Sequence, residues 1–86
     1  MKCGKKVRLR GGFTVEVREA RKEYRCFFCR KAIRARHKYV ALSRYGSEPE
    51  HYHLECFNHV MPHRLVVMVL DGEPEVCYSP EDYSVL

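Results

Sequence analysis

Apolar and polar residues alternate near the start of the chain, a pattern typical of strands with one buried face. The alternation runs through residues 7 to 9 and 13 to 17, on either side of Gly11 and Gly12. Two alternating runs joined by glycines predict a β-hairpin. We therefore expect an N-terminal hairpin over residues 7 to 19.

A second hairpin is expected toward the end of the chain. The longest apolar run, Leu65 to Leu70, is followed by Asp71-Gly72 and then by Val76 to Tyr78. Asp-Gly between two such runs is a strong turn signal. The pattern predicts a C-terminal hairpin over residues 65 to 78, followed by an acidic tail over residues 79 to 86.

The middle of the chain changes period. Residues 38 to 44 (KYVALSR) and 51 to 53 read as two strands separated by turn residues. Beyond them, apolar residues recur at helical spacing until Pro62 ends the pattern: Leu54, Phe57, Val60 and Met61. The sequence thus predicts one short helix after the second strand.

The length of the chain limits its hydrophobic core. Eighty-six residues form one domain, and a core of that size leaves a small margin of stability, so a further stabilising element is expected. No apolar run approaches the ~20 residues that span a membrane, so no membrane contact is expected.

The five cysteines favour metal binding over a disulfide framework. The number is odd, and residues 1 to 10 are basic with no apolar run after them, so no secretory signal is expected. We expect an intracellular location, the cytoplasm or a eukaryotic nucleus, where disulfides are rare. Cys3 and Cys77 have no evident partner and are expected as thiols, with a second weak metal site as the alternative.

Four residues form the strongest chemical motif, Cys26-x2-Cys29-x23-His53-x2-Cys56. Thiolate and imidazole are the ligands of structural zinc, and pairs with two residues between them are a usual spacing. Four protein ligands close the tetrahedral shell, so we expect one structural Zn²⁺ and no catalysis. A redox Cys-x2-Cys would require a surrounding βαβ pattern, which is not visible.

The identity of the histidine ligand is open from spacing alone. His53-x2-Cys56 and Cys56-x2-His59 both place two ligands within reach of one ion if a helix begins near Leu54. His51 and His63 are less favoured, because one lies on the preceding strand and the other follows Pro62.

The same segment resembles the zinc finger of poly(ADP-ribose) polymerases. The similarity covers residues 24 to 62 and is carried by Cys26-x2-Cys29, Ile33 and the string Tyr52-His53-Leu54-Glu55-Cys56-Phe57. It implies Cys26, Cys29, His53 and Cys56 as ligands. The predicted fold is accordingly a small α+β, treble-clef-like zinc domain of antiparallel hairpins and one short helix.

Zinc fingers of this family recognise ends and breaks in DNA, which the resemblance therefore implies as the ligand. Phosphate contacts would come from the strand after Ile33. Where the family places an arginine, this chain has Tyr39, with Lys38 beside it, and where the family has a tryptophan it has His51.

The charge of the chain independently favours a polyanionic partner. Residues 1 to 44 carry 15 Lys and Arg against 3 Glu, whereas residues 45 to 86 carry one Arg against 8 acidic residues. A basic strip with interleaved tyrosines suits phosphate contact and base stacking. We expect DNA as the partner, with RNA as the alternative, and the predicted contacts are Arg30, Lys31, Arg34, Arg36, Lys38, Tyr39 and Arg44.

Two other classes of function share parts of this pattern. The paired ligands are also similar to the first half of a LIM domain, which would make the chain a protein-interaction module with a partner on the acidic C-terminal half. A His-Asn-His nuclease is suggested by His51, His53, Asn58 and His59, but their order and spacing fit poorly. We therefore expect no enzyme, and the sequence does not predict an oligomeric state.

Overall fold

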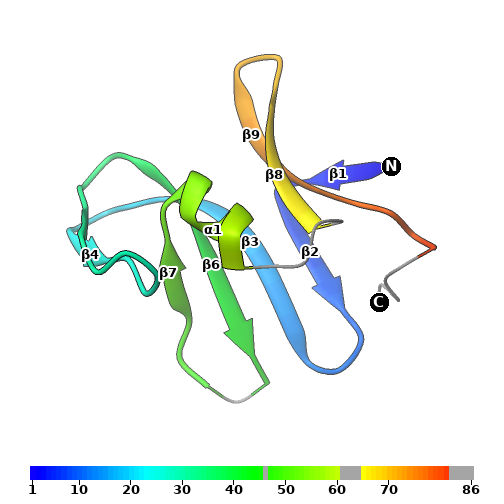
Figure 1. Ribbon diagram of the computed structural model, residues 1–86, viewed down its shortest axis with the longest axis horizontal. Coiled ribbons are helices and arrows are strands. Elements are labelled where there is room, and N and C mark those ends of the chain that lie inside the picture. Colours follow the sequence, from blue (N-terminus) through cyan, green and yellow to red (C-terminus); the bar gives the residue numbers. More distant parts are fainter. Residues whose placement is uncertain (46, 61–64, 82–86) are drawn as a thin grey trace.

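A four-stranded antiparallel sheet organises the first two thirds of the protein. The computed structural model describes residues 1–45, 47–60 and 65–81, and the strand order of this sheet is β2-β3-β6-β7 (Figure 1). Its strands are β2 (Lys6–Leu9), β3 (Phe13–Glu19), β6 (Lys38–Arg44) and β7 (Glu50–Tyr52). The expected N-terminal hairpin is formed by β2 and β3, and the expected strand over residues 38 to 44 is β6.

A smaller antiparallel sheet has the order β1-β9-β8. It consists of β1 (Lys2–Gly4), β8 (Leu65–Leu70) and β9 (Glu73–Tyr78). Asp71 and Gly72 connect β8 to β9 with φ angles of 52° and 81°, the left-handed backbone that an Asp-Gly turn adopts. Figure 1 shows this hairpin projecting beyond the larger sheet.

Strand β1 was not predicted, and its pairing with β9 brings two cysteines together, Cys3 and Cys77. Cys3 lies directly opposite Cys77 in the β1–β9 register, and the two sulfurs form a disulfide. The expectation that these residues lack a partner is wrong. A strand of three residues whose partner lies 74 positions away leaves no local signal in the sequence.

One short helix follows β7. It is α1 (Leu54–Val60), and its first turn is closed by the N–H of Phe57, which donates to the carbonyl of His53 at 3.0 Å. The helix begins where its periodicity predicted. The expected stop at Pro62 lies outside the described residues, as do His63, the turn residue Gly46 and the tail from residue 82 onward.

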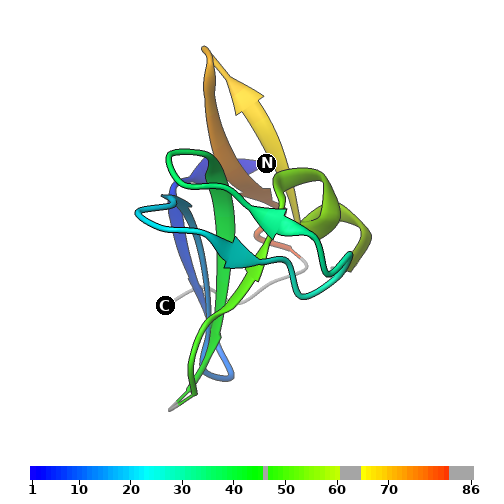
Figure 2. The same ribbon diagram turned by 90° about the vertical axis from the view of Figure 1, so that its left-hand side faces the viewer.

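The core lies between one face of the larger sheet, the helix and the smaller sheet. Val15 and Val40 are fully buried on that face, and Phe57, Leu65 and Val76 are fully buried opposite them. Helix α1 packs on β8, and β3 packs on β9, which Figure 2 shows from the side. These contacts place the start of α1 at the edge of the larger sheet.

A third ribbon, β4 (Tyr24–Arg25) and β5 (Ala32–Ile33), projects from the side of the larger sheet. The turn between its strands carries the first two cysteines of the motif. The predicted architecture of antiparallel strands with one short helix around a Cys-Cys-His-Cys cluster is confirmed. Among the described residues, no helix is long and apolar enough to cross a membrane.

Candidate metal centre

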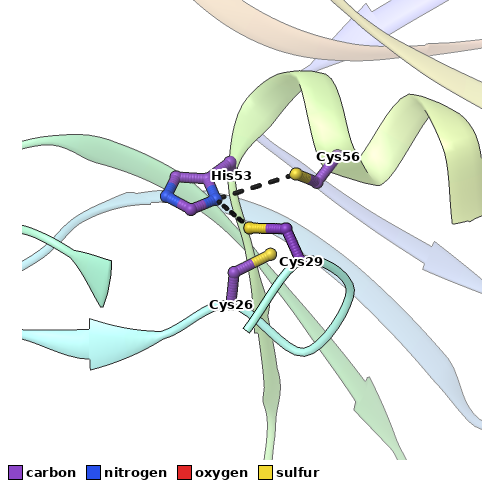
Figure 3. A group of neighbouring side chains, drawn as sticks. All are labelled: Cys26, Cys29, His53 and Cys56. Carbon is purple, nitrogen blue, oxygen red and sulfur yellow. Dashed lines mark hydrogen bonds between the residues drawn. The ribbon is translucent and has the colours of Figure 1, made fainter. Parts of the chain in front are cut away.

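The segment from Cys26 to Lys31 forms a tight knuckle at the end of the β4–β5 ribbon. The N–H of Cys26 donates to the carbonyl of Lys31 at 2.9 Å, and the N–H of Arg30 donates to the carbonyl of Cys26 at 3.0 Å. Arg30 has a φ of 67°, in the left-handed region. This turn brings the sulfurs of Cys26 and Cys29 to one side of the ribbon (Figure 3).

The other two ligand candidates flank the start of α1. His53 precedes the first helical residue, and Cys56 lies in the first turn. The N–H of Phe27 donates to the carbonyl of His51 at 2.7 Å, so the knuckle is bonded to the end of β7 two residues before His53. One backbone hydrogen bond therefore sets the position of the first ligand pair relative to the second.

The four predicted ligands converge on one point. The three sulfurs and one imidazole nitrogen all lie within 4.8 Å of one another. Nδ1 of His53 is 3.3 Å from Sγ of Cys29 and 3.7 Å from Sγ of Cys56. In a tetrahedral zinc site with bonds of 2.0–2.3 Å, ligand atoms are separated by about 3.5–3.8 Å. Three thiols and one imidazole at these separations fit one Zn²⁺.

The orientation of the His53 ring is fixed by a hydrogen bond on the side away from the sulfurs. Its Nε2 lies 3.0 Å from the carbonyl oxygen of Ala32, so Nε2 carries the proton and donates it to that oxygen. This tautomer leaves the lone pair of Nδ1 directed at the sulfurs of Cys29 and Cys56. The sequence motif alone does not reveal this contact with the carbonyl of Ala32, which holds the ring in position.

The surroundings of the cluster favour the thiolate form of Cys26 and disfavour that of Cys56. Burial acts to raise the pKa of the Cys26 thiol, but the backbone N–H groups of Cys29, His53 and Phe28 outweigh it and lower that pKa to about 6. Burial and the neighbouring sulfurs of Cys29 and Cys26 raise the pKa of the Cys56 thiol to about 12. Several thiolates in this small space therefore require a bound cation.

The other histidines have different surroundings. His59 is exposed on α1, and its ring stacks on that of Phe28 with centroids 5.9 Å apart. His51 lies on β7, where its ring stacks on that of Tyr24 at 4.2 Å. Of the two alternatives left open by spacing, the structure places His53 in the cluster.

The predicted nucleic-acid contacts fall into separate groups. Most of these side chains are exposed on the knuckle, on the loop that leads to β6 and at the first residue of β6: Arg30, Lys31, Arg34, Arg36 and Lys38. Arg44 lies at the opposite end of β6, about 20 Å along a strand of seven residues. The seven predicted contacts therefore do not form one continuous strip.

Tyr39 differs from the expected role. Its side chain is only 2% exposed, because the rings of Tyr24 and His51 lie within 5.4 Å of its centroid and cover it. A ring in that position is a packing element and offers no face to a base. The expectation that Tyr39 stacks on nucleic acid is therefore corrected.

Comparisons with known proteins give no match: no family model, no curated protein and no solved structure is significantly similar to the chain. The site is therefore interpreted from its own residues. What the structure supports is a small domain whose Cys-Cys-His-Cys cluster has the geometry of a zinc site.

Proposed function

We propose that this protein is a zinc-stabilised DNA-binding domain whose basic knuckle contacts DNA. The observation that carries the proposal is the segment from Arg25 to Lys38, which contains six Lys and Arg residues and no Asp or Glu. Duplex DNA carries one negative charge per ~1.7 Å of its axis and gains affinity by releasing counterions to such a segment.

The cations of the knuckle and of the segment that follows it are available to bind phosphate. Arg30, Lys31 and Arg34 are exposed and form no ion pair with another described residue, and the same holds for Arg36 and Lys38. An unpaired surface cation is already solvated, so it can approach a phosphate without first losing a carboxylate.

Exposed aromatic rings accompany these cations. Phe27 and Phe28 lie at the tip of the knuckle with 48% and 52% of their surface exposed. The guanidinium of Arg30 lies 5.0 Å from the centroid of the Phe27 ring. A planar apolar surface beside phosphate-binding groups suits bases that are unstacked at an end or a break.

The resemblance of residues 24 to 62 to poly(ADP-ribose) polymerase zinc fingers supports broken DNA as the preferred form. We propose a structural role for the zinc and no catalysis, because four protein ligands leave no coordination position for water.

The test is binding of the zinc-loaded protein to intact, nicked and blunt-ended duplexes of one sequence over a salt series. About five phosphate contacts predict a slope of log affinity against log salt near −4.5. Tighter binding to the broken duplexes at moderate salt supports the preference for ends. Absence of binding to all three at low salt contradicts the proposed function.

A pair of variants localises the contact. The double substitution of Lys31→Gln and Arg34→Gln should weaken duplex binding and reduce the salt slope by about 1.8, because two contacts are removed. The control is the double substitution of Lys2→Gln and Lys5→Gln, which removes the same charge near β1, on the opposite side of the molecule from β4 (Figure 1). Equal losses in the two variants would show that only net charge acts.

A protein-interaction module is the second candidate. Met68 and Val69 are 42% and 65% exposed on the projecting β8–β9 hairpin, which lies in the acidic half of the chain. This function is favoured if the protein binds none of the intact, nicked and blunt-ended duplexes.

A further inference from the structure

The outer face of the larger sheet contains an open hollow at the end away from the knuckle. Its volume is about 360 Å³, and it lies over β2, β3 and the end of β6. We call it the hairpin groove, and the residues that line it include Lys6, Arg8, Thr14, Arg18, Arg44 and Tyr45.

Register explains why polar side chains gather there. Arg8 lies opposite Thr14, and Thr14 lies opposite Ser43, so these three residues share one face of the sheet. Their neighbours Val7 and Val15 point to the other face and are buried in the core. The groove is therefore the solvent side of the N-terminal hairpin.

The groove is positively charged. Four cations line it and no carboxylate does. Arg18 donates to the carboxylate of Glu16 at 2.8 Å, whereas Lys6 and Arg8 form no ion pair with another described residue. Arg44 lies opposite Phe13 in the β3–β6 register, so its side chain leaves the sheet on the other face, where its guanidinium lies 5.5 Å from the centroid of the Phe13 ring, and it borders the groove only at the rim. Such a lining favours an anionic ligand with several charges.

An exposed aromatic ring stands at the end of the groove. Tyr45 is 92% exposed, although a tyrosine normally covers part of its ring. A Cβ atom at Gly12 would lie 2.7 Å from the Cβ of Tyr45, so the glycine allows the base of the side chain to rest on the β2–β3 turn. The ring is thus held at its base while both of its faces remain open to a planar ligand.

We propose that the hairpin groove binds a segment of single-stranded DNA, with phosphates on Lys6 and Arg8 and a base stacked on Tyr45. Repeated negative charges and planar groups are what this combination of cations and an exposed ring recognises. A single strand is required because the bases of an intact duplex are stacked on one another. The inference rests on the proposed function in taking DNA as the polymer.

The groove differs in position from the knuckle contact. Lys6 and Arg8 lie on the N-terminal hairpin, outside residues 24 to 62, and Arg44 begins the turn at the far end of β6. A DNA with a single-stranded overhang could therefore contact the knuckle with its duplex and the groove with its overhang.

The test uses the full zinc-loaded chain, a 12-nucleotide oligo(dT) and a blunt-ended duplex of two strands without an overhang. The double substitution of Lys6→Gln and Arg8→Gln should weaken oligo(dT) binding at least tenfold and reduce its salt slope by about 1.4. It should leave duplex binding within about twofold. The double substitution of Lys31→Gln and Arg34→Gln is the charge-matched control and should show the opposite preference.

A second set of variants tests the ring. Tyr45→Leu should weaken oligo(dT) binding about tenfold, because stacking on the ring is lost, and Tyr45→Phe should retain it. Inorganic polyphosphate of equal charge should be insensitive to Tyr45→Leu. Equal effects of this substitution on oligo(dT) and polyphosphate would overturn the stacking contact and with it the proposed ligand.

The two proposals fail in different ways. If the blunt-ended duplex binds through the knuckle while the groove variants bind oligo(dT) like the wild type, the groove proposal is overturned and the proposed function stands. If the groove substitutions weaken oligo(dT) binding while no duplex binds to the protein, the groove proposal is supported and the proposed duplex contact of the knuckle is contradicted. At least tenfold tighter binding of oligo(rU) than of oligo(dT) would overturn the choice of DNA.

Discussion

The side chain of Asn58 pairs with the backbone of Val67 as a neighbouring strand would. Its Oδ1 accepts from the N–H of Val67 at 2.8 Å, and its Nδ2 donates to the carbonyl of the same residue at 3.2 Å. These two bonds attach α1 to β8, across a segment that connects the zinc-bearing part of the chain to the C-terminal hairpin. The amide that suggested a nuclease motif is thus engaged in a contact between secondary-structure elements.

Removing this amide should destabilise the fold without affecting the metal centre. Asn58→Ala leaves the N–H and carbonyl of Val67 without partners at a partly buried site, which costs about 1–3 kcal/mol of unfolding free energy. Asn58→Asp keeps the acceptor and loses the donor, so we expect an intermediate loss. Urea unfolding in zinc-containing buffer measures both, and a stability of Asn58→Ala equal to the wild type would show that the pair contributes nothing.

Zinc removal should unfold the part of the protein that holds the four ligands. Metal binding in small zinc domains provides about 10–16 kcal/mol, which is comparable to or larger than the net stability of about 5–15 kcal/mol that domains possess. A chelator should therefore abolish amide protection in β4, β5 and α1. Hydrogen exchange with and without chelator makes the measurement, and unchanged protection in these elements would contradict a structural role for the metal.

Substitution of two neighbouring histidines should distinguish ligand from surface residue. His53→Ala removes the nitrogen that lies 3.3 Å from the sulfur of Cys29, so the variant should lose its stoichiometric zinc. His59→Ala removes only an exposed ring stacked on Phe28 and should retain one zinc per chain. Metal content after gel filtration gives the comparison, and zinc loss in His59→Ala alone would reverse the assignment.

The ring of His51 should make stability depend on pH. Burial lowers the pKa of His51 below its usual value of 6.5, and the positive charges of Arg18 and Lys22 lower it further. As the pH falls below 6.5, the unfolded chain therefore takes up more protons at this residue than the folded chain, and the folded state loses stability. This contribution is complete above the unfolded pKa and is lost toward the folded one.

A variant isolates that contribution from protonation of the metal ligands. His51→Phe retains a ring against Tyr24 and has no proton to bind, so its stability should fall less than that of the wild type between pH 7 and pH 5. Urea unfolding of both chains in excess zinc gives the difference. An NMR titration that places the pKa of His51 at or above 6.5 would contradict the prediction.

The features that the sequence predicted correctly are local. Cys26 and Cys29 are paired by one turn of backbone, and His53 and Cys56 by the start of one helix, so each pair is formed locally. Spacing left His59 open beside His53, and the resemblance implied His53. The Asp71-Gly72 turn is likewise formed by two adjacent residues. In each case the physical cause lies within a few positions of the chain.

The features that the sequence did not reveal depend on contacts between distant segments. Tyr39 was predicted as a nucleic-acid contact from its place in the basic strip, but the rings of Tyr24, fifteen positions earlier, and of His51 cover it. The Cys3–Cys77 pair depends on a strand of three residues at one edge of the smaller sheet. Neither contact is encoded by spacing or period, so only the folded chain shows it.

The disulfide should stabilise the oxidised protein by constraining the unfolded chain. It closes a loop with a sequence separation of 74, and disulfides of this kind contribute about 2–4 kcal/mol. Cys3→Ser should lower the thermal midpoint under oxidising conditions and have little effect under reducing ones. Cys3 is the position to substitute because it is exposed, whereas Cys77 is fully buried. Identical midpoints in oxidising buffer would show that the bond adds no stability.

Two glycines with the same backbone conformation should respond differently to one added methyl group. Gly12 and Gly72 have φ angles of 85° and 81°, so alanine costs about 1–2 kcal/mol of strain at either turn. At Gly72 nothing lies within 4 Å of the added Cβ, whereas at Gly12 the Cβ of Tyr45 lies 2.7 Å away. Gly12→Ala should therefore lose clearly more stability than Gly72→Ala in urea unfolding.

A double-mutant cycle assigns the extra loss at Gly12 to this contact. Tyr45→Gly removes the Cβ that collides with the new methyl group, so Gly12→Ala in that background should cost only as much as Gly72→Ala. The same cycle tests whether the β2–β3 turn supports the base of the Tyr45 side chain. If Gly12→Ala costs the same free energy in both backgrounds, the β2–β3 turn at Gly12 does not contact Tyr45 in solution. Tyr45 then lacks the support that holds its ring at the end of the hairpin groove.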